Sequence, residues 1–305
     1  MADEPVVESS GPRREILASH RAMVGSIEVR RALPQRTHRT VGAWCFADHM
    51  GPAAVTEQRG LDIGPHPHTG LATVTWLIEG EAVHHDSLGT EQLIRPGQLN
   101  LMSAGHGVAH SEEPTGAYRG TLEGIQLWIA QPEQSRHSPR AFEHHAELPR
   151  LEIGACEATV LVGEALGATS PARHDTALVG LDLDVHGATE MPLVRAYEYG
   201  VVVLRGAVSI DGTLVEPGAL AYFAPGVDEW RLDVREPARV IVLGGAPMDE
   251  SITMWWNFVA RNRDELTAAY LAWVDRDERF GTVASTLAPI DAPVPFWLRA
   301  GEART

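Results

Sequence analysis

The chain has 305 residues, of which 44% are hydrophobic, and this length is comfortable for two domains that each bury a core. Its 41 acidic and 25 basic residues give a formal net charge of −16, which disfavours direct binding to nucleic acid or to an anionic membrane. Two cysteines are too few for a disulfide framework or a structural zinc cluster.

The start of the chain carries no apolar segment of the kind found in signal peptides, and no run is long enough to cross a membrane. Two cysteines that are far apart in sequence are more typical of a cytosolic protein with reduced thiols than of a secreted protein with disulfides. We therefore expect a cytoplasmic protein, and we expect it to be a monomer.

The predicted elements of the first half are short strands. The composition of residues 1–22 predicts a mobile tail, and we expect a first domain over residues 23–135. Apolar and polar residues alternate over 26–33, which is typical of a half-buried strand, and 41–47 is a second apolar run. Further short runs, separated by glycine and proline turns, cover 71–78, 82–87, 91–95, 99–102 and 124–129. This spacing predicts a β-sandwich or β-barrel.

The second half repeats landmarks of the first. After a polar connection over 131–149, in which we expect a helical turn near 141–145, residues 150–305 predict a second domain. Apolar runs end at Gly80 and at Gly206, and Pro-Gly opens the next strand at 96–97 and at 217–218. The matched order indicates a duplicated domain. Residues 262–265 have the form of a capping box, which predicts a helix over 266–274, packed on the second barrel.

Two pairs of side chains carry the chemistry of the first domain. His66 and His68 are two residues apart, so in a strand they point to the same face, and the same holds for His110 and Glu112. Two antiparallel strands could bring these four together. Three imidazoles and a carboxylate suit one divalent ion such as Fe, Ni, Mn, Cu or Zn, whereas a structural zinc site usually includes thiolates. The simpler alternative, a surface His-x-His pair, is disfavoured by the second pair.

The repeat gives an internal comparison for these positions. Counting from Gly206 places Pro192 and Val194 at the positions of His66 and His68, and counting from Gly218 places Arg231 at that of His110. The second domain therefore lacks the ligand set, and we expect it to be metal-free and to serve as a scaffold that covers the first.

The sequence resembles the pirin family. The similarity is strong over residues 25–130 and looser near 255–259, and it is carried by the segments 46–52, 66–68, 73–80, 86–89, 95–97 and 102–112. It implies an all-β bicupin, with two consecutive double-stranded β-helix (jelly-roll) barrels and a C-terminal helix. It also implies one metal ion in the N-terminal barrel, usually Fe(II), with His66, His68, His110 and Glu112 as its ligands.

Three further histidines lie near these segments. Many family members have Arg at the position of His106, which we expect to influence local charge without binding the metal. His84 and His85 are adjacent in a strand, so at most one of them faces the cavity, and we expect each to lie on the surface or at the rim.

Two functions are consistent with these features. The resemblance implies a dioxygenase that acts on quercetin or a related flavonol with O2, and Glu112 would then be both a metal ligand and the general base. The alternative is a non-enzymatic regulator that responds to the redox state of iron and binds a transcription factor or a metabolic enzyme. Both functions need the same metal site.

Overall fold

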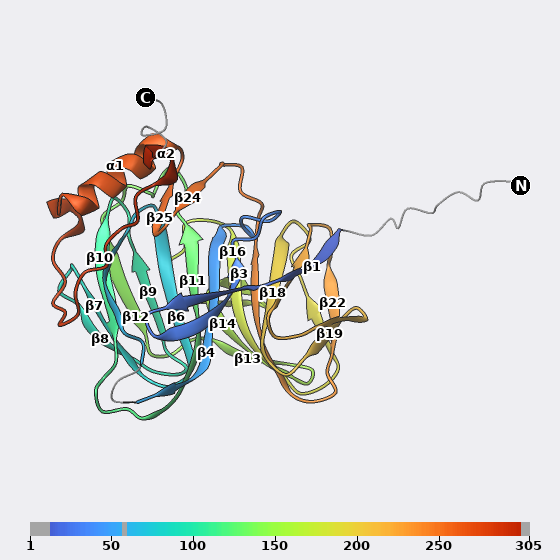
Figure 1. Ribbon diagram of the computed structural model, residues 1–305. Helices are drawn as coiled ribbons and strands as arrows, with labels where there is room; N and C mark the ends of the chain where they lie inside the picture. The colour runs from blue at the N-terminus through green and yellow to red at the C-terminus, as the bar shows by residue number, and fades with distance from the viewer. Residues whose placement is uncertain (1–12, 57–59, 300–305) are drawn as a thin grey trace, which may run out of the picture.

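The computed structural model describes residues 13–56 and 60–299, and it consists of two β-barrels side by side (Figure 1). Each barrel has one large and one small sheet. In the first barrel the large sheet runs in the order β12 (Ala141–His145), β9 (Leu99–Ser103), β6 (Leu71–Glu79), β11 (Gly120–Ala130), β4 (Trp44–Val55), β3 (Ile27–Leu33) and β2 (His20–Val24). The small sheet consists of β5 (Ile63–His68), β10 (Val108–Glu113), β7 (Ala82–Asp86) and β8 (Glu91–Ile94).

The second barrel has the same arrangement, so the predicted all-β bicupin is confirmed. Its large sheet runs in the order β1 (Arg14–Ala18), β21 (Ala219–Phe223), β18 (Glu198–Arg205), β23 (Ala238–Gly245), β16 (Leu178–Val185), β14 (Cys156–Ala165) and β13 (Arg150–Ile153), with β15 (Ala168–Thr169) beside β14. Its small sheet consists of β17 (Thr189–Pro192), β22 (Glu229–Asp233), β19 (Val208–Ile210) and β20 (Thr213–Val215).

The two large sheets pack against each other through one shared apolar core. Side chains alternate between the two faces of the sheet along β6, so one strand serves both interiors. Val74 and Trp76 belong to the shared core, whereas Thr75 points into the first barrel and contacts Glu112 there. Trp44 crosses the interface, and its indole N–H donates to the carbonyl oxygens of Val179 and Gly244. A strand of the first barrel thus buries one face between the barrels and presents the other to the interior of its own barrel.

The range predicted as a mobile tail includes two strands. β2 pairs with β3 of the first barrel, and β1 pairs with β21 of the second, so this part of the chain ties the barrels together. Residues 1–12 lie outside the described residues. The helical turn expected near 141–145 is also wrong, because these residues form β12 on the edge of β9.

The last part of the chain returns to the first barrel. It contains the hairpin of β24 (Thr253–Trp255) and β25 (Phe258–Ala260), helix α1 (Arg263–Val274), the 3-10 turn η1 (Glu278–Phe280) and the short helix α2 (Phe296–Arg299). The helix start predicted from this motif is confirmed, since Asn262 is the N-cap and its side chain accepts from the Glu265 N–H, while the Glu265 carboxylate accepts from the backbone N–H of Arg261.

The position of α1 corrects the expectation that it packs on the second barrel. Its buried residues Leu266 and Ala269 share a core with Ala109 of β10 and with Phe258, and Figure 1 shows the helix above the first barrel. Among the residues described, none of the helices has the length and apolar character needed to cross a membrane.

Candidate metal centre

Strands β5 and β10 bring the predicted histidines together. The two strands are antiparallel and His66 is the direct partner of His110, while His68 lies two residues further along β5 on the same face. All three side chains are buried. One ring nitrogen of each lies within 4.8 Å of the others, and the three form the only such group found among the described residues.

The hydrogen bonds of the rings fix which nitrogen is free. The Nδ1 of His66 lies 2.9 Å from the carbonyl oxygen of Gly64, and the Nδ1 of His68 lies 3.1 Å from that of Asn257. A carbonyl only accepts, so both Nδ1 atoms carry the proton and both Nε2 atoms present a lone pair. The Nε2 of His68 faces the Nε2 of His110 at 3.1 Å. Ring nitrogens whose free lone pairs converge in a buried site can coordinate one metal cation.

Burial keeps these imidazoles neutral. It lowers the pKa of His66 to about 4 and lowers the pKa values of His68 and His110 well below the ordinary value. Because a metal binds only the neutral ring, the site is ready for a cation at neutral pH without first losing protons. The residues present therefore fit a bound divalent metal.

Glu112 lies on the same strand as His110 but outside the three-histidine group. The pairing of β10 with β5 shifts between these two residues, so that Glu112 is opposite Ile63. The Thr75 hydroxyl donates to its Oε1 at 3.1 Å. Burial raises the pKa of Glu112 to about 7. The carboxylate thus stands in the same cavity as the histidines, close to the balance between its charged and neutral forms.

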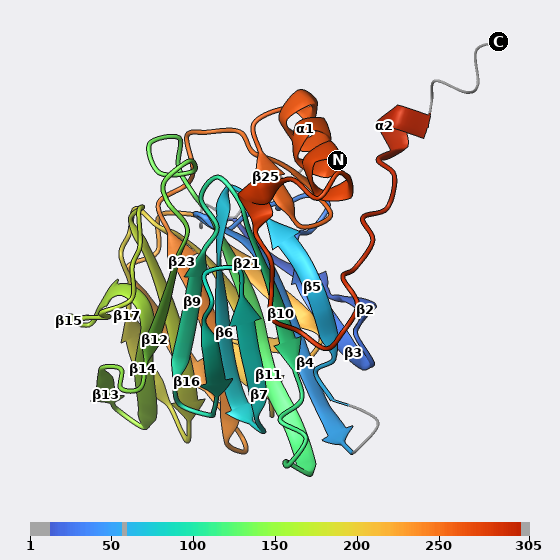
Figure 2. The same ribbon diagram turned by 90° about the vertical axis from the view of Figure 1, so that its left-hand side faces the viewer.

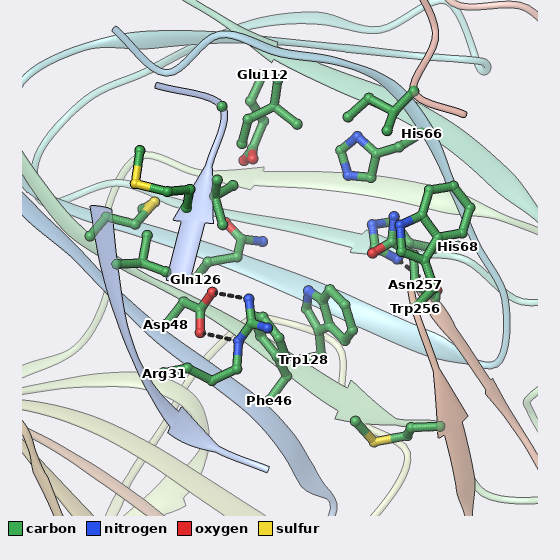
Figure 3. A pocket seen from close by; sticks show the side chains of 18 of the residues that line it. Arg31, Phe46, Asp48, His66, His68, Glu112, Gln126, Trp128, Trp256 and Asn257 are labelled. Atoms are coloured by element: carbon green, nitrogen blue, oxygen red, sulfur yellow. Dashed lines mark hydrogen bonds and ion pairs between the residues drawn. The ribbon is translucent and has the colours of Figure 1, made fainter. Parts of the chain in front are cut away.

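A cavity of about 570 Å³ contains all four predicted residues in its wall. Figure 3 shows His66, His68 and Glu112 around it, with Trp128 on a facing side. Trp128 stacks on Phe46 with their ring centroids 3.9 Å apart. The remaining wall is largely apolar or aromatic and includes Met23, Met50, Met254, Trp255 and Trp256.

One ion pair lies in this wall. Arg31 binds both carboxylate oxygens of Asp48, at 2.8 and 2.7 Å, and its guanidinium also lies over the Phe46 ring (Figure 3). Burial raises the pKa of Asp48, and the hydrogen bonds from Arg31 oppose that rise. The pair supplies a fixed polar edge to an otherwise apolar wall.

The C-terminal segment completes the site, and only the loose similarity at residues 255–259 pointed to its involvement. Besides the Asn257 carbonyl, it contributes Trp255, Trp256 and Ile290 to the cavity wall. Figure 2 shows it passing beside β5, where the Ile290 N–H donates to the carbonyl oxygen of Pro65. A Cβ at Gly64 would collide with the carbonyl oxygen of Ala288, so the glycine permits this close approach.

The other histidines of the first barrel have different surroundings. His84 is buried against His110, which contradicts the expected surface position, whereas His85 points the other way, toward Glu113. His106 is exposed, and its ring lies beside His137 rather than in the cavity wall. His49 is buried and bonded to Glu123.

The matching strands of the second barrel carry apolar side chains instead. The counted positions Pro192 and Arg231 do lie on β17 and β22, but both side chains are exposed. The buried cross-strand pair at this place is Met191 with Trp230, one residue away from each counted position. Trp230 packs against Tyr199 and Phe223, with ring centroids 5.2 and 4.6 Å away.

Comparison with known proteins agrees with the architecture. The pirin family model matches residues 26–129, and the model of the pirin C-terminal cupin domain matches residues 178–281. A Pseudomonas aeruginosa protein named "Putative quercetin 2,3-dioxygenase" is 44% identical over 90% of this chain and 87% of its own length. A pirin-like protein of Caulobacter vibrioides is 36% identical over 85% of this chain and 92% of its own.

A solved structure is similar over nearly its full length. The crystal structure of quercetin 2,3-dioxygenase from Acinetobacter baumannii has a TM-score of 0.89 and 42% identity, and the match covers 92% of this chain and 95% of that one. With both family models matched in order and a close relative covered over most of its length, the chain belongs to the pirin family.

Proposed function

We propose that the protein is an iron-dependent dioxygenase that acts on quercetin or a related flavonol with O2. The observation that carries the proposal is that three convergent imidazoles and the Glu112 carboxylate line one cavity with apolar and aromatic walls. Its volume of about 570 Å³ falls within the range of roughly 300–1,000 Å³ that is usual for small-molecule sites. The names of the similar Pseudomonas and Acinetobacter proteins support the same substrate class.

His66, His68 and His110 would hold the metal through their free ring nitrogens, and we assign Glu112 as the fourth ligand. Iron in this place would supply the redox chemistry that lets dioxygen react with an organic substrate. Nitrogen and carboxylate donors without thiolate are compatible with Fe(II), and also with Ni, Mn, Cu or Zn. All four side chains are buried and already lie around one cavity.

Glu112 is also the proposed general base. Its carboxylate lies in the wall of the same cavity as the three imidazoles, where it could accept the proton of a substrate hydroxyl. The Thr75 hydroxyl donates to Oε1 of Glu112 at 3.1 Å and thereby restricts the orientation of the carboxylate. The proton would therefore be taken up at one defined position in the cavity.

The aromatic wall suits a planar substrate. Trp128 stacks on Phe46, and the guanidinium of Arg31 lies over the Phe46 ring. These contacts hold the Trp128 ring in place. A flat aromatic ligand gains contact area and stacking energy on such a surface. The methionines of the wall adapt to irregular substituents.

The test is oxygen uptake by iron-loaded protein with a panel of flavonols, together with bleaching of the flavonol absorption band. We expect Glu112→Gln to lower kcat by roughly 10²–10⁴-fold, the usual contribution of a general base. Glu113→Gln is the matched control, because Glu113 accepts from the Ser111 hydroxyl and is outside the cavity wall. Fully metallated protein that consumes no oxygen with any flavonol would overturn the proposal and favour the regulator.

A further inference from the structure

A chain of hydrogen bonds leads away from the metal centre behind His110. The Nδ1 of His110 lies 3.3 Å from the Nδ1 of His84, and the Nε2 of His84 lies 3.2 Å from Oδ2 of Asp86. His84 and Asp86 are two residues apart on β7, so both side chains lie on the same face of the sheet as His110, whose direct partner on β7 is Asp86. Neither residue lines the cavity, so neither touches a substrate there.

The far end of the chain is fixed by the backbone. Oδ1 of Asp86 accepts from the N–H groups of Leu88 and Thr90, at 2.8 and 3.0 Å. Burial alone would raise the pKa of Asp86, but the hydrogen bonds from His84 and from these amides lower it below its ordinary value. The carboxylate therefore remains an anion, and its Oδ2 can only accept from His84.

This anion determines the direction of every bond in the chain. His84 must donate from Nε2 to Asp86, so a neutral His84 has a lone pair on Nδ1. His110 must then donate from its own Nδ1, and its Nε2 lone pair is left pointing at His68 and the metal position. The ring of His84 is held in place by Phe142, which stacks on it with centroids 4.5 Å apart.

We propose that His84 and Asp86 are positioning residues that hold His110 in the tautomer and orientation required to bind the metal. Backbone carbonyl oxygens hold the rings of His66 and His68 by accepting from their Nδ1 atoms, whereas the ring of His110 is held by two side chains. An anion at the end of the chain also increases the electron donation of the His110 ring to the metal. The inference rests on the proposed metal site but not on dioxygenase activity.

Cobalt(II) titration of the metal-free protein tests it, because cobalt binding is visible in the absorption spectrum. His84→Leu removes the acceptor for His110 and should weaken cobalt binding by roughly 10–100-fold, the usual effect of an outer partner of a metal ligand. His84→Gln retains a side-chain oxygen that can accept from His110 and should recover most of the affinity. A purely space-filling role predicts equal losses for both variants.

Asp86→Asn tests the direction of the chain. Its side-chain oxygen would remain with the two backbone amides, so its amide nitrogen would donate to His84 and push the His84 proton onto Nδ1. Two N–H groups would then face each other between His84 and His110. We expect weaker cobalt binding, an altered cobalt spectrum, and imidazole nitrogen chemical shifts that show a changed tautomer in the metal-free protein.

The matched control is His85→Leu, because His85 is the next residue on β7 and faces Glu113 instead of His110. It should bind cobalt as the unmodified protein does. If His84→Leu and Asp86→Asn both bind cobalt with unchanged affinity and spectrum, the inference is wrong although the metal site stands. If the unmodified protein binds no cobalt, iron or nickel, the metal site itself is wrong, and the inference fails with it.

Discussion

The two barrels have the same sheet order but different interiors. In the first, strands β5 and β10 of the small sheet pair His66 with His110, and a cavity adjoins this pair. In the second, the corresponding strands pair Met191 with Trp230, and the indole packs among other aromatic rings. A few inward-facing side chains thus decide whether the same backbone holds a site or a closed core.

The barrels also differ in what other parts of the chain add to them. The segment after the second barrel crosses back and places the Asn257 carbonyl on His68 and Trp256 in the cavity wall. The first barrel therefore depends for its site on residues almost two hundred positions away in sequence. The second barrel receives β1 from the start of the chain, which extends its sheet.

The largest expected effect is the loss of metal binding in His68→Ala. The variant removes one of the three convergent ring nitrogens, and its effect should exceed the roughly 10–100-fold that follows from changing an outer partner. Metal analysis of purified protein and cobalt titration measure it. His186→Ala, an exposed position of the second barrel, should retain full metal content. If His68→Ala keeps its full metal content, the first barrel does not hold metal through these histidines, and the proposed difference between the two barrels is wrong.

The next effect concerns the core of the second barrel. Trp230→Ala leaves a cavity and should lower the free energy of unfolding by about 3–5 kcal/mol without changing metal content. Trp128→Ala in the first barrel should cost less stability, because that ring already borders a cavity. Denaturant unfolding of the metal-free proteins compares the two.

A milder variant keeps this comparison informative if Trp230→Ala does not fold. The Nε1 of Trp230 has no hydrogen-bond partner among the described residues, so Trp230→Phe loses no hydrogen bond, and because it leaves a smaller cavity it should cost less stability than Trp230→Ala. A loss of metal in either Trp230 variant would contradict the independence of the two interiors.

Much of the first barrel could be predicted because its signals are local. The two-residue period predicted that His66 and His68 share one face of a strand and that His110 and Glu112 share one face of another, and the resemblance to pirins supplied the bicupin fold. The internal count was one residue off at Pro192 and Arg231, because turn lengths differ between the repeats and a shift of one reverses the face of a strand.

Other features depend on long-range pairing and could not be read from local sequence. Adjacent histidines point to opposite faces, but that His84 rather than His85 meets His110 is set by the register of β7 against β10. Residues 141–145 have no helical or strand period of their own, and pairing with the edge of β9 decides their conformation. The return of residues 255–290 to the first barrel is likewise a tertiary outcome.

The smallest effect concerns the contact that joins the barrels beside their cores. Arg205, at the end of β18, forms ion pairs with Glu79 and with the buried Glu123 of the first barrel. Glu123 also pairs with His49 at 3.1 Å. Arg205→Met leaves Glu123 with one partner fewer and should lower the free energy of unfolding by about 1–3 kcal/mol at neutral pH.

The pH dependence of this loss separates a charge effect from a packing effect. Burial alone would raise the pKa of Glu123, but hydrogen bonds from His49 and Arg205 lower it below the ordinary 4.5. A carboxyl with a lowered folded-state pKa stabilises the protein above its unfolded pKa, and this contribution is lost as the pH falls through the folded-state pKa. Unfolding of metal-free protein should therefore show a difference between Arg205→Met and the unmodified chain that persists from pH 7 to about pH 4.5 and shrinks as the pH falls further. The exposed pair of Arg195 with Asp228, within the second barrel, provides the control: Arg195→Met should cost about 0–1 kcal/mol. A loss of stability in Arg205→Met that stays the same well below pH 4.5 would mean that the two barrels are held here by packing alone.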